Sequence, residues 1–470
     1  MCIRDRITRK KSMLGSLLCK TPVWRAARAP RLSAVAPART WRGVTTSSDA
    51  PPEQRAVLRL KTGEAFEGRS FGAPRSVFGE TVFTTSITSY TESLTDPSYQ
   101  GQLLTFTQPL MGNYGVPNNR TPGSAAEHPQ DVDVGCFLES PRVQAAGVVV
   151  SNLSERFSHF QAHESLATWC AHNDVPGIQD VDTRALTTLL RNQGSTLGAI
   201  LVGEDADRIP PADAFPDPMD ENLVARVSAR APYTLQPRAG AEQARAHVAL
   251  LDFGCKANIL RSLLRLGVSV TVLPWDYDFN AVRDQFDGLF LSNGPGSPES
   301  IGPAVATVRR AIEQWDRPIF GICMGNQVIG LAIGLRAYRM KFGNRGHNQP
   351  VLALGGGGMR VQAGRVYITS QNHGYALAYE ETGPDAWPDG WAPWFVNAND
   401  WSIEGIVRQA ATEERGRELA PVWGVQFHPE HAGGPEDTNS LFTDFVEQVV
   451  QYKQLRGPRV VLPDASTQAS

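Results

Sequence analysis

The spacing of apolar residues differs between the two halves of the chain. Between residues 55 and 205, short alternating runs such as "RAVLRLKTGEAFEG", "ETVFTTSITS" and "GQLLTFTQPL" predict strands, with Thr62-Gly63 at the turn of a hairpin. The stretch "DTRALTTLLRNQG" predicts a helix that begins after Asp182 and stops at Gly194. We therefore expect the first half to be a strand-rich α/β domain.

From about residue 245 the pattern becomes an alternation of strands and helices. Strands are predicted by "HVALLDFG", "VSVTVLPW", "FDGLFLS" and "RPIFGI", and helices by "KANILRSLLRLG", "PAVATVRRAIEQW" and "MGNQVIGLAIG". This order is typical of an α/β fold with a mainly parallel sheet and helices on both faces, whose ligands bind at the carboxyl ends of strands. We expect this domain at 245–455, after a linker at 206–244 that is rich in Pro, Asp and Ala, and before a tail at 456–470.

Charge sets residues 1–48 apart from the rest. They hold eight arginines, three lysines and one acid, about +10, and because the whole chain carries −3, about −13 remains for the other residues. An Arg-, Ser- and Ala-rich, acid-poor start predicts a mitochondrial transit peptide, with Met13 as an alternative start to Met1, and hence a mitochondrial matrix protein. A basic arm for nucleic acid is the alternative, but no later surface pattern of aromatic and basic residues supports a nucleic-acid partner.

The bulk composition is that of an ordinary globular protein, with 41% hydrophobic and 20% charged residues. No stretch approaches about 18 consecutive apolar residues, so no membrane span is expected. The cysteines form no C-x-x-C pair and no Cys/His cluster with zinc spacing. They are Cys2, Cys19, Cys136, Cys170, Cys255 and Cys323. We therefore expect neither a disulfide framework nor a metal site.

Cys323 is the first candidate for chemistry. It lies between Gly321 and Gly325 where a predicted strand meets a predicted helix, which is the pattern of a nucleophile elbow. The helix that follows places its positive dipole end beside the sulfur and favours the thiolate. On this segment alone a buried structural cysteine remains the alternative.

A thiolate mechanism also needs a base, and "VWGVQFHPEHAGG" contains one. His428 and Glu430 follow a predicted strand at positions i and i+2, so both side chains can face one site. Glu430 can then orient the imidazole for proton transfer with Cys323, whereas His431 points away.

The loop "SNGPGSP" could supply donors for a developing oxyanion. Gly294 and Gly296 can direct backbone N–H groups into a site, and the N–H of Met324 would be a further donor. A simple tight turn is the alternative for this loop.

These motifs together resemble a known family. G-I-C-M-G-N-Q, S-N-G-P-G-S-P and F-H-P-E resemble the class I glutamine amidotransferases, which use a Cys-His-Glu triad. "MKFGNRGHNQPV", "TSQNHGYAL", "LDFGCKANILR", "SYTESLTDPSY", "GNYGVP" and "DTRALTTLLRNQG" are similar to the small, glutamine-hydrolysing chain of carbamoyl-phosphate synthase, over roughly residues 55–450. The implied fold is a class I glutamine amidotransferase domain preceded by a strand-rich α/β small-chain domain.

The resemblance assigns roles residue by residue. It implies that Cys323 is the nucleophile, His428 the base and Glu430 its orienting partner. The residues implied to bind glutamine or its oxyanion are Ser98, Gly294, Gly296, Met324, Gln327, Asn372, Gly374 and Tyr375. Asn326, where the family often has histidine, and Tyr375, where phenylalanine is common, depart from the pattern without touching the triad. We interpret His373 as a positioning or packing residue.

The resemblance also implies the partners. L-glutamine is the expected substrate, and a separate large chain, with ATP and Mg²⁺, is expected to receive ammonia and dock on the first domain. No cofactor is expected on this chain, because "LGGGGMR" lacks the Lys-Ser/Thr that follows a phosphate loop. The carbamoyl phosphate would serve arginine synthesis, with pyrimidine synthesis as the alternative. Another amidotransferase subunit and a non-catalytic binding subunit with a vestigial triad are the competing hypotheses.

Overall fold

The computed structural model of the protein describes residues 53–117, 138–237, 240–355, 359–379, 387–409 and 420–455. These residues all belong to one compact unit, Val44–Ser470. The transit peptide predicted at 1–48, the tail at 456–470, part of "LGGGGMR" and three of the cysteines lie outside the described residues.

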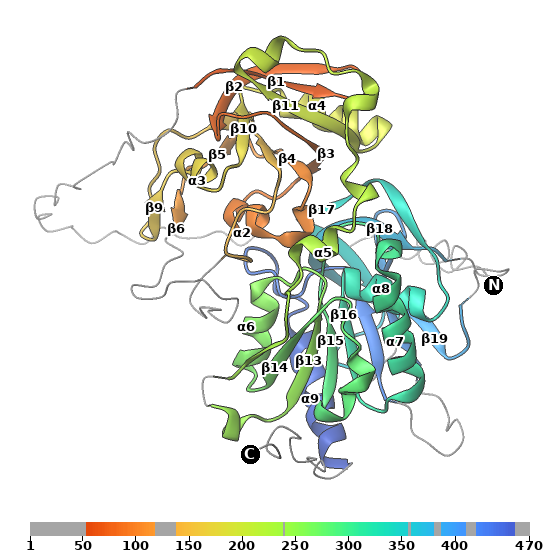
Figure 1. The fold of residues 1–470 in the computed structure, drawn as a ribbon. Helices are drawn as coiled ribbons and strands as arrows, with labels where there is room; N and C mark the ends of the chain where they lie inside the picture. Colours follow the sequence, from red (N-terminus) through yellow and green to blue (C-terminus); the bar gives the residue numbers. More distant parts are fainter. Residues whose placement is uncertain are drawn as a thin grey trace, which may run out of the picture. The chain divides into compact units, whose positions relative to one another are not determined.

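The first half of the described chain forms a closed barrel with the strand order β1-β11-β3-β4-β7-β10-β2 (Figure 1). The strands of the barrel are β1 Arg55–Leu60, β2 Ala65–Gly72, β3 Val77–Thr84, β4 Gln102–Phe106, β7 Gly147–Val149, β10 Pro176–Gln179 and β11 Thr196–Val202. β3, β4, β7 and β10 run parallel, and the other pairs are antiparallel. The strand-rich first domain is thereby confirmed.

Two local predictions in this half are confirmed by the backbone. Gly63 has φ 108° in the turn between β1 and β2, a conformation that favours glycine. Helix α4, Thr183–Gln193, begins where Asp182 Oδ1 accepts a hydrogen bond from the N–H of Ala185 at 2.8 Å, and it ends at Gly194 with φ 106°.

Short elements surround the barrel and lead out of it. Those within the first half are α2 Tyr90–Thr95, η1 Pro97–Tyr99, β5 Leu110–Met111, β6 Val116–Pro117, β8 Asn152–Leu153, β9 Ala162–Glu164 and α3 Leu166–His172. The next segment contains η2 Gly203–Asp207, η3 Ala212–Ala214, η4 Pro218–Asp220, α5 Leu223–Val227, β12 Tyr233–Leu235 and η5 Ala241–Gln243. Of these, β12 joins the sheet of the second half.

The second half of the described chain is built on a ten-stranded sheet with the order β12-β14-β13-β15-β16-β21-β20-β19-β17-β18. Its other strands are β13 His247–Asp252, β14 Ser269–Pro274, β15 Gly288–Leu291, β16 Ile319–Ile322, β17 Ala337–Ala353, β18 Val366–Leu377, β19 Trp391–Asn397, β20 Ile403–Arg408 and β21 Val422–Val425. The segment β14-β13-β15-β16-β21 is parallel, as predicted. An antiparallel part, β20-β19-β17-β18, extends it.

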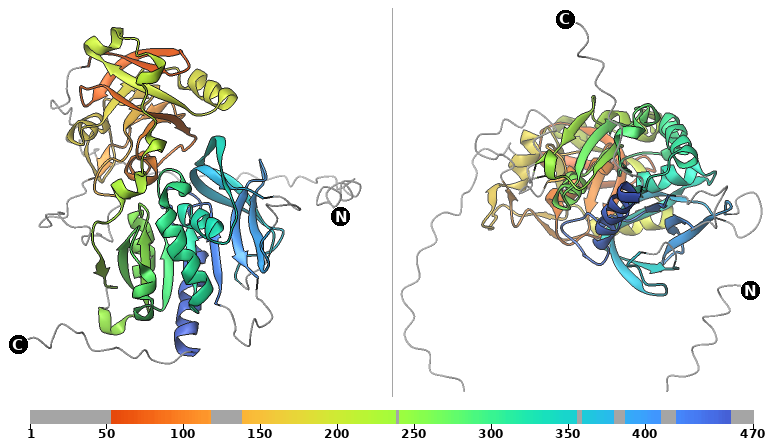
Figure 2. Two further views of the ribbon diagram at one scale, coloured as in Figure 1. Left: turned by 45° about the vertical axis from the view of Figure 1, so that its right-hand side comes forward. Right: turned by 90° about the horizontal axis from the view of Figure 1, so that it is seen from below.

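Helices cover both faces of the parallel part (Figure 2). They are α6 Ala257–Arg265, α7 Gly302–Gln314, α8 Met324–Ala332 and α9 Ser440–Leu455, with short turns η6 Phe279–Ala281, η7 Arg283–Gln285 and η8 Pro298–Ile301. Val248 and Leu250 of β13 belong to the core that includes α6 and α9, while Ala249 and Leu251 belong to the core that includes α7 and α8. Every second residue of a strand faces one side, so a buried parallel strand needs apolar residues throughout.

Candidate active site

Cys323 sits on a strained turn between β16 and α8. Its backbone has φ 54° and ψ −103°, a conformation that L-residues other than glycine rarely adopt. A Cβ at Gly321 would lie 2.6 Å from the carbonyl group of Gly325, so the turn can close only around a glycine. The side chain is buried, its residue 3% exposed, and Sγ lies 3.8 Å from the carbonyl oxygen of Asn372. This is the geometry that the elbow pattern predicts.

His428 and Glu430 follow the adjacent parallel strand, β21, and form a buried pair. His428 Nδ1 lies 2.6 Å from Glu430 Oε1, and the backbone N–H of His428 donates to the carbonyl of Ser370 at 2.8 Å. The other ring nitrogen, Nε2, is buried without a hydrogen-bond partner among the described residues. The imidazole is therefore held by one nitrogen, and the other is left for chemistry at the neighbouring sulfur.

The charges around the pair favour an imidazolium and a carboxylate. Burial and Lys256 lower the pKa of His428, but Glu430 and Cys323 outweigh them and raise it to about 10. Burial raises the pKa of Glu430, but Lys256 and His428 outweigh it and lower the value to about 2. The site thus holds a protonated histidine beside Cys323, which is the form able to protonate a leaving amine.

A small cavity, partly open to solvent, gives access to Cys323. Its lining brings together every residue predicted to bind glutamine except Met324: Ser98, Gly294, Gly296, Gln327, Asn372, Gly374 and Tyr375. Met324 is the first residue of α8, so its N–H has no acceptor within the helix and lies directly after the sulfur-bearing residue. The remaining lining includes Glu80, Gln102 and Arg339, which sequence reasoning did not single out.

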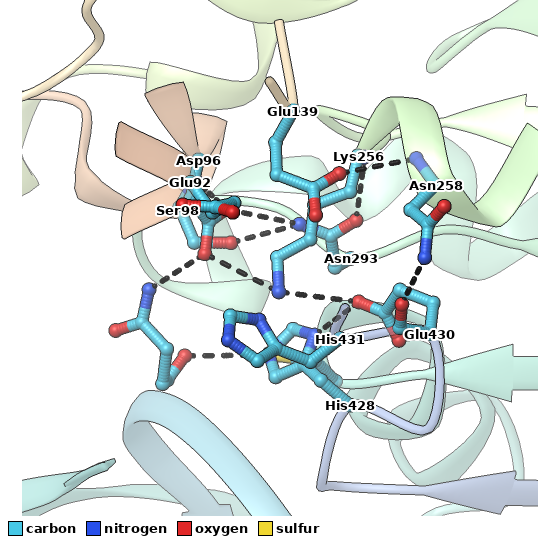
Figure 3. A network of polar contacts seen from close by, with 12 residues as sticks. Glu92, Asp96, Ser98, Glu139, Lys256, Asn258, Asn293, His428, Glu430 and His431 are labelled. Carbon is cyan, nitrogen blue, oxygen red and sulfur yellow. Dashed lines mark hydrogen bonds and ion pairs between the residues drawn. The ribbon is translucent and has the colours of Figure 1, made fainter. Parts of the chain in front are cut away.

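A buried network of charges and amides lies behind the triad (Figure 3). Lys256 Nζ is 3.2 Å from Glu430 Oε1 and 3.5 Å from Asp96 Oδ2, and its side chain is 3% exposed. Asn258 donates to the carbonyl oxygen of Glu430 through its side-chain amide, and its backbone N–H donates to Glu139 at 3.0 Å. Burial raises the pKa of Glu139 to about 7. Lys256 therefore joins Glu430 to Asp96, a carboxylate of the barrel half.

Amide groups complete the link between the barrel half and the substrate cavity. Asn372 Nδ2 donates to Asp96 Oδ2 at 3.0 Å, and Asn293 Nδ2 donates to Ser98 Oγ at 2.9 Å. Asn293 Oδ1 in turn accepts from the backbone N–H of Lys256 at 3.0 Å. Two of the predicted glutamine-binding residues, Ser98 and Asn372, are thus fixed by the same network that holds Glu430.

His373 and His431 lie near the site, but their ring nitrogens meet partners other than Cys323 and Glu430. His373 is buried, its Nδ1 lies 2.9 Å from the carbonyl of Tyr375 and its Nε2 lies 3.1 Å from Gln371 Oε1. His431 stacks on His347 with ring centroids 4.0 Å apart and with the two Nε2 atoms 3.1 Å apart. Burial lowers the pKa of His373 to about 4 and that of His431 well below its usual range. Both are neutral structural groups here.

Three observations on the described residues concern metal sites, membrane spans and cysteines. Across the described ranges no group of three or more His, Cys, Asp or Glu side chains is arranged to hold a metal ion. In the same residues no helix is both long and apolar enough to cross a bilayer. The cysteines that the structure describes, Cys170, Cys255 and Cys323, carry free thiols.

Comparison with known proteins decides the family. The model of the carbamoyl-phosphate synthase small chain, CPSase domain, matches residues 58–200, and that of the class-I glutamine amidotransferases matches residues 249–448. The arginine-specific small chain of carbamoyl phosphate synthase from Emericella nidulans is 45% identical over 429 residues, which cover 91% of this chain and 87% of that protein. The chain belongs to the carbamoyl-phosphate synthase small-chain family.

Other relatives in this family also match over most of both chains. The arginine-specific small chain from Aspergillus clavatus is 46% identical over 87% of this chain and 82% of its own, and that from Aspergillus oryzae is 44% identical over 94% and 90%. A solved structure of a glutamine amidotransferase from Thermotoga maritima covers 40% of this chain and 76% of its own at 17% identity and a TM-score of 0.29, too low to carry an argument. Family membership confirms the predicted fold class and an enzyme of the glutamine amidotransferase type. The match over 58–200 argues against a subunit of another amidotransferase.

Sequence reasoning missed the network behind the triad. Asp96 lies two residues before Ser98, and Lys256 lies in the quoted motif "LDFGCKANILR", four residues after the end of β13 at Asp252. A lysine at the carboxyl end of a buried strand was a usable signal, because that edge of the sheet also carries Cys323 and His428. What it binds there could not be read from one segment, because Asp96 is 160 positions away.

Proposed function

We propose that the protein hydrolyses L-glutamine to glutamate and ammonia with Cys323, His428 and Glu430, and that it passes the ammonia to the large chain of carbamoyl-phosphate synthase. The observation that carries this proposal is the arrangement of a strained, buried cysteine, which lines a cavity, beside a histidine that Glu430 holds at 2.6 Å. Family membership supports the substrate class, because the second half matches the class-I glutamine amidotransferases.

In the first step the Cys323 thiolate attacks the side-chain carbonyl carbon of glutamine, so that a C–S bond forms and the carbonyl electrons move onto oxygen. The backbone N–H of Met324 and those of the loop that holds Gly294 and Gly296 stabilise this oxyanion. The tetrahedral intermediate collapses when His428 gives its proton to the amide nitrogen, which leaves as ammonia. A glutamyl thioester remains on Cys323.

In the second step His428, now neutral, removes a proton from water, and the resulting hydroxide attacks the thioester carbon. The C–S bond breaks, glutamate leaves, and the thiolate and imidazolium are restored. Glu430 keeps the ring oriented through Nδ1 in both steps, while Lys256 keeps Glu430 ionised. Ser98, Gln327, Asn372, Gly374 and Tyr375, which line the cavity, bind glutamine.

The test is a comparison of nitrogen donors in the complex with the large chain. Cys323→Ser should abolish glutamine-dependent synthesis of carbamoyl phosphate and leave synthesis from added ammonia intact. A matched control is Cys170→Ser, which changes another buried thiol that lies in the barrel half. If Cys323→Ser left glutamine use unchanged, or if the wild-type complex used only ammonia, the triad would be vestigial and the proposal wrong.

The ATP- and Mg²⁺-dependent steps are assigned to the large chain, which we propose docks on the barrel half. Carbamoyl phosphate made by this pair would serve arginine synthesis, as the names of the Emericella and Aspergillus relatives suggest. Co-purification with an ATP-binding large chain supports this assignment, and growth without arginine should fail in a deletion strain. A deletion strain that needs pyrimidine but not arginine would contradict it.

We further propose that the protein works in the mitochondrial matrix and that residues 1–48 direct it there. The support is the charge of about +10 in this segment. A fluorescent protein fused to residues 1–55 should enter mitochondria, and the same fusion with Arg25, Arg28, Arg31, Arg39 and Arg42 changed to glutamine should not. Cytosolic fluorescence of the unchanged fusion would refute the location.

A further inference from the structure

Gln426 is a buried amide that borders the substrate cavity without lining it. It is 0% exposed, and it lies between β21 and His428, where its backbone N–H donates to the carbonyl of Glu404 at 2.9 Å. Its side-chain oxygen, Oε1, accepts a hydrogen bond from Gln327 Nε2 at 3.1 Å and a longer one from Asn326 Nδ2 at 3.4 Å. Its own Nε2 has no partner among the described residues. The oxygen of the Gln426 side chain, which accepts from Gln327 and Asn326 of α8, therefore fixes the orientation of this side chain.

The hydrogen bond from Gln327 to Gln426 helps to determine which atom of the Gln327 carboxamide faces the cavity. Gln327 Nε2 also donates to the backbone carbonyl of Tyr375 at 2.9 Å. A backbone carbonyl can only accept, so the atom beside it is the nitrogen of the amide. An amide nitrogen has two hydrogens, and Gln426 and Tyr375 accept one each. What remains of Gln327 for a ligand in the cavity is the oxygen Oε1, which can only accept.

The position of Gln327 indicates which part of the substrate meets this acceptor. The reacting end of the cavity is marked by Asn372, whose carbonyl lies 3.8 Å from the sulfur. Tyr375, whose carbonyl holds Gln327, is three residues farther along β18, and a strand rises about 3.3 Å per residue, so the two carbonyls are roughly 10 Å apart. Gln327 thus lies toward the end of the cavity where the α-carbon substituents of glutamine would be, and the donor on that carbon is the α-ammonium.

We propose that Gln426 is a positioning residue that makes Gln327 a dedicated hydrogen-bond acceptor and so makes the cavity select substrates with a free α-ammonium group. This inference rests on the proposed glutaminase function and deepens it. Without the oxygen of Gln426, one N–H of Gln327 has no acceptor and only the carbonyl of Tyr375 still holds the amide nitrogen. The carboxamide then turns its nitrogen toward the cavity more readily. A nitrogen in that place would oppose an ammonium instead of accepting from it.

The experiment measures the choice between two amides in the complex with the large chain. L-glutamine and glutaramate, which is glutamine without its α-amino group, are compared through kcat/KM for ammonia release. Gln426→Met removes the acceptor and keeps a side chain of similar length. We expect kcat/KM for glutamine to fall on the order of 10-fold to 100-fold, through KM, as fits the loss of one hydrogen bond to a charged group, while kcat/KM for glutaramate stays within about 2-fold.

Two further variants separate positioning from packing. Gln426→Glu retains an oxygen acceptor at this place and should recover most of the preference for glutamine. Asn326→Ala removes a fully buried side chain that donates to the same oxygen but has no hydrogen bond to the side chain of Gln327 in the described structure, and it should leave the preference unchanged. If Gln426→Met folds poorly, calorimetry can compare the binding of the two amides in a background that does not turn over, Cys323→Ser. The proteins compared are then Cys323→Ser alone, Cys323→Ser with Gln426→Glu, and Cys323→Ser with Gln426→Leu.

The outcomes are distinct. A parallel loss with both amides in Gln426→Met, or a preference equal to that of the wild type, would overturn the role of Gln426 even though the glutaminase function stands. Equal loss of preference in Asn326→Ala would show that packing alone is responsible. A wild-type complex that releases ammonia from neither amide would refute the proposed function and this inference with it.

Discussion

Lys256→Met tests whether the buried network behind the triad stabilises the fold and keeps Glu430 ionised. Methionine keeps most of the length of the side chain and removes its charge. Lys256 Nζ lies 3.2 Å from Glu430 and 3.5 Å from Asp96, and the three side chains are 3%, 0% and 4% exposed. The variant therefore leaves two carboxylates buried without the cation that they share.

The magnitude follows from the pKa of Glu430. Burial alone would raise this pKa above its ordinary 4.5, yet Lys256, followed by His428, lowers it to about 2. A shift of this size corresponds to about 3 kcal/mol of stability, and breaking a buried ion pair by removing one partner costs about 3–5 kcal/mol. We expect the free energy of unfolding to fall by on the order of 3 kcal/mol at pH 7.

The loss of stability in Lys256→Met should depend on pH in a defined direction. A carboxyl group whose pKa is lower in the folded state stabilises the fold above its unfolded pKa, and this contribution is lost as the pH falls through the folded value. For Glu430 that window runs from 4.5 down to about 2. The difference in stability between wild type and Lys256→Met should therefore be largest near neutral pH and should shrink as the pH falls through this window.

Urea unfolding followed by tryptophan fluorescence at pH 7 and pH 3 measures the effect. A matched control is Arg310→Met, which removes an ion pair with Asp278 of 3.0 Å in which both side chains are about half exposed, and it should change stability by less than about 1 kcal/mol. If Lys256→Met lost no more than this control at pH 7, or lost the same amount at both pH values, the reasoning about the buried network would be wrong.

The remaining predictions concern the elbow and two buried titratable groups. Gly321→Ala should abolish ammonia release and lower the thermal midpoint, because its Cβ would meet the backbone of Gly325 at 2.6 Å, whereas Gly302→Ala, with open space around the Cβ, should keep full activity and wild-type melting. Burial lowers the pKa of His347 from 6.5 to about 4, so the fold loses stability as the pH falls from 6.5 to about 4. In urea unfolding, His347→Phe should lose less stability over this pH range than the wild type, and an equal loss would contradict the expectation. Burial raises the pKa of Glu404 to about 8 from 4.5, so Glu404→Gln should gain stability over the wild type as the pH rises through that window, which unfolding at pH 5 and pH 8 would show.

The sequence by itself determined several local elements. Asp182 and Gly194 mark the ends of α4 because a side-chain oxygen can satisfy a free N–H of the first turn and glycine adopts the positive φ that ends the helix. Gly321 and Gly325, two positions before and after Cys323, mark the elbow for a similar reason, because the backbone of Cys323 is strained and a Cβ at Gly321 would meet the backbone of Gly325. Such signals are local, and they survive in a single segment of sequence.

Only the tertiary structure decided which distant groups meet. Asp96 and Lys256 lie 3.5 Å apart although 160 positions separate them, and Gln426 meets Gln327 across 99 positions. These pairings depend on how the barrel half meets the sheet and on which strands are neighbours, because β16 and β21 are adjacent in the sheet but about 100 residues apart in the chain. The sequence around a charged or amide side chain does not indicate its partner, because water satisfies that group in the unfolded chain. Once folding buries the group, it needs a hydrogen-bond or ion-pair partner within the protein.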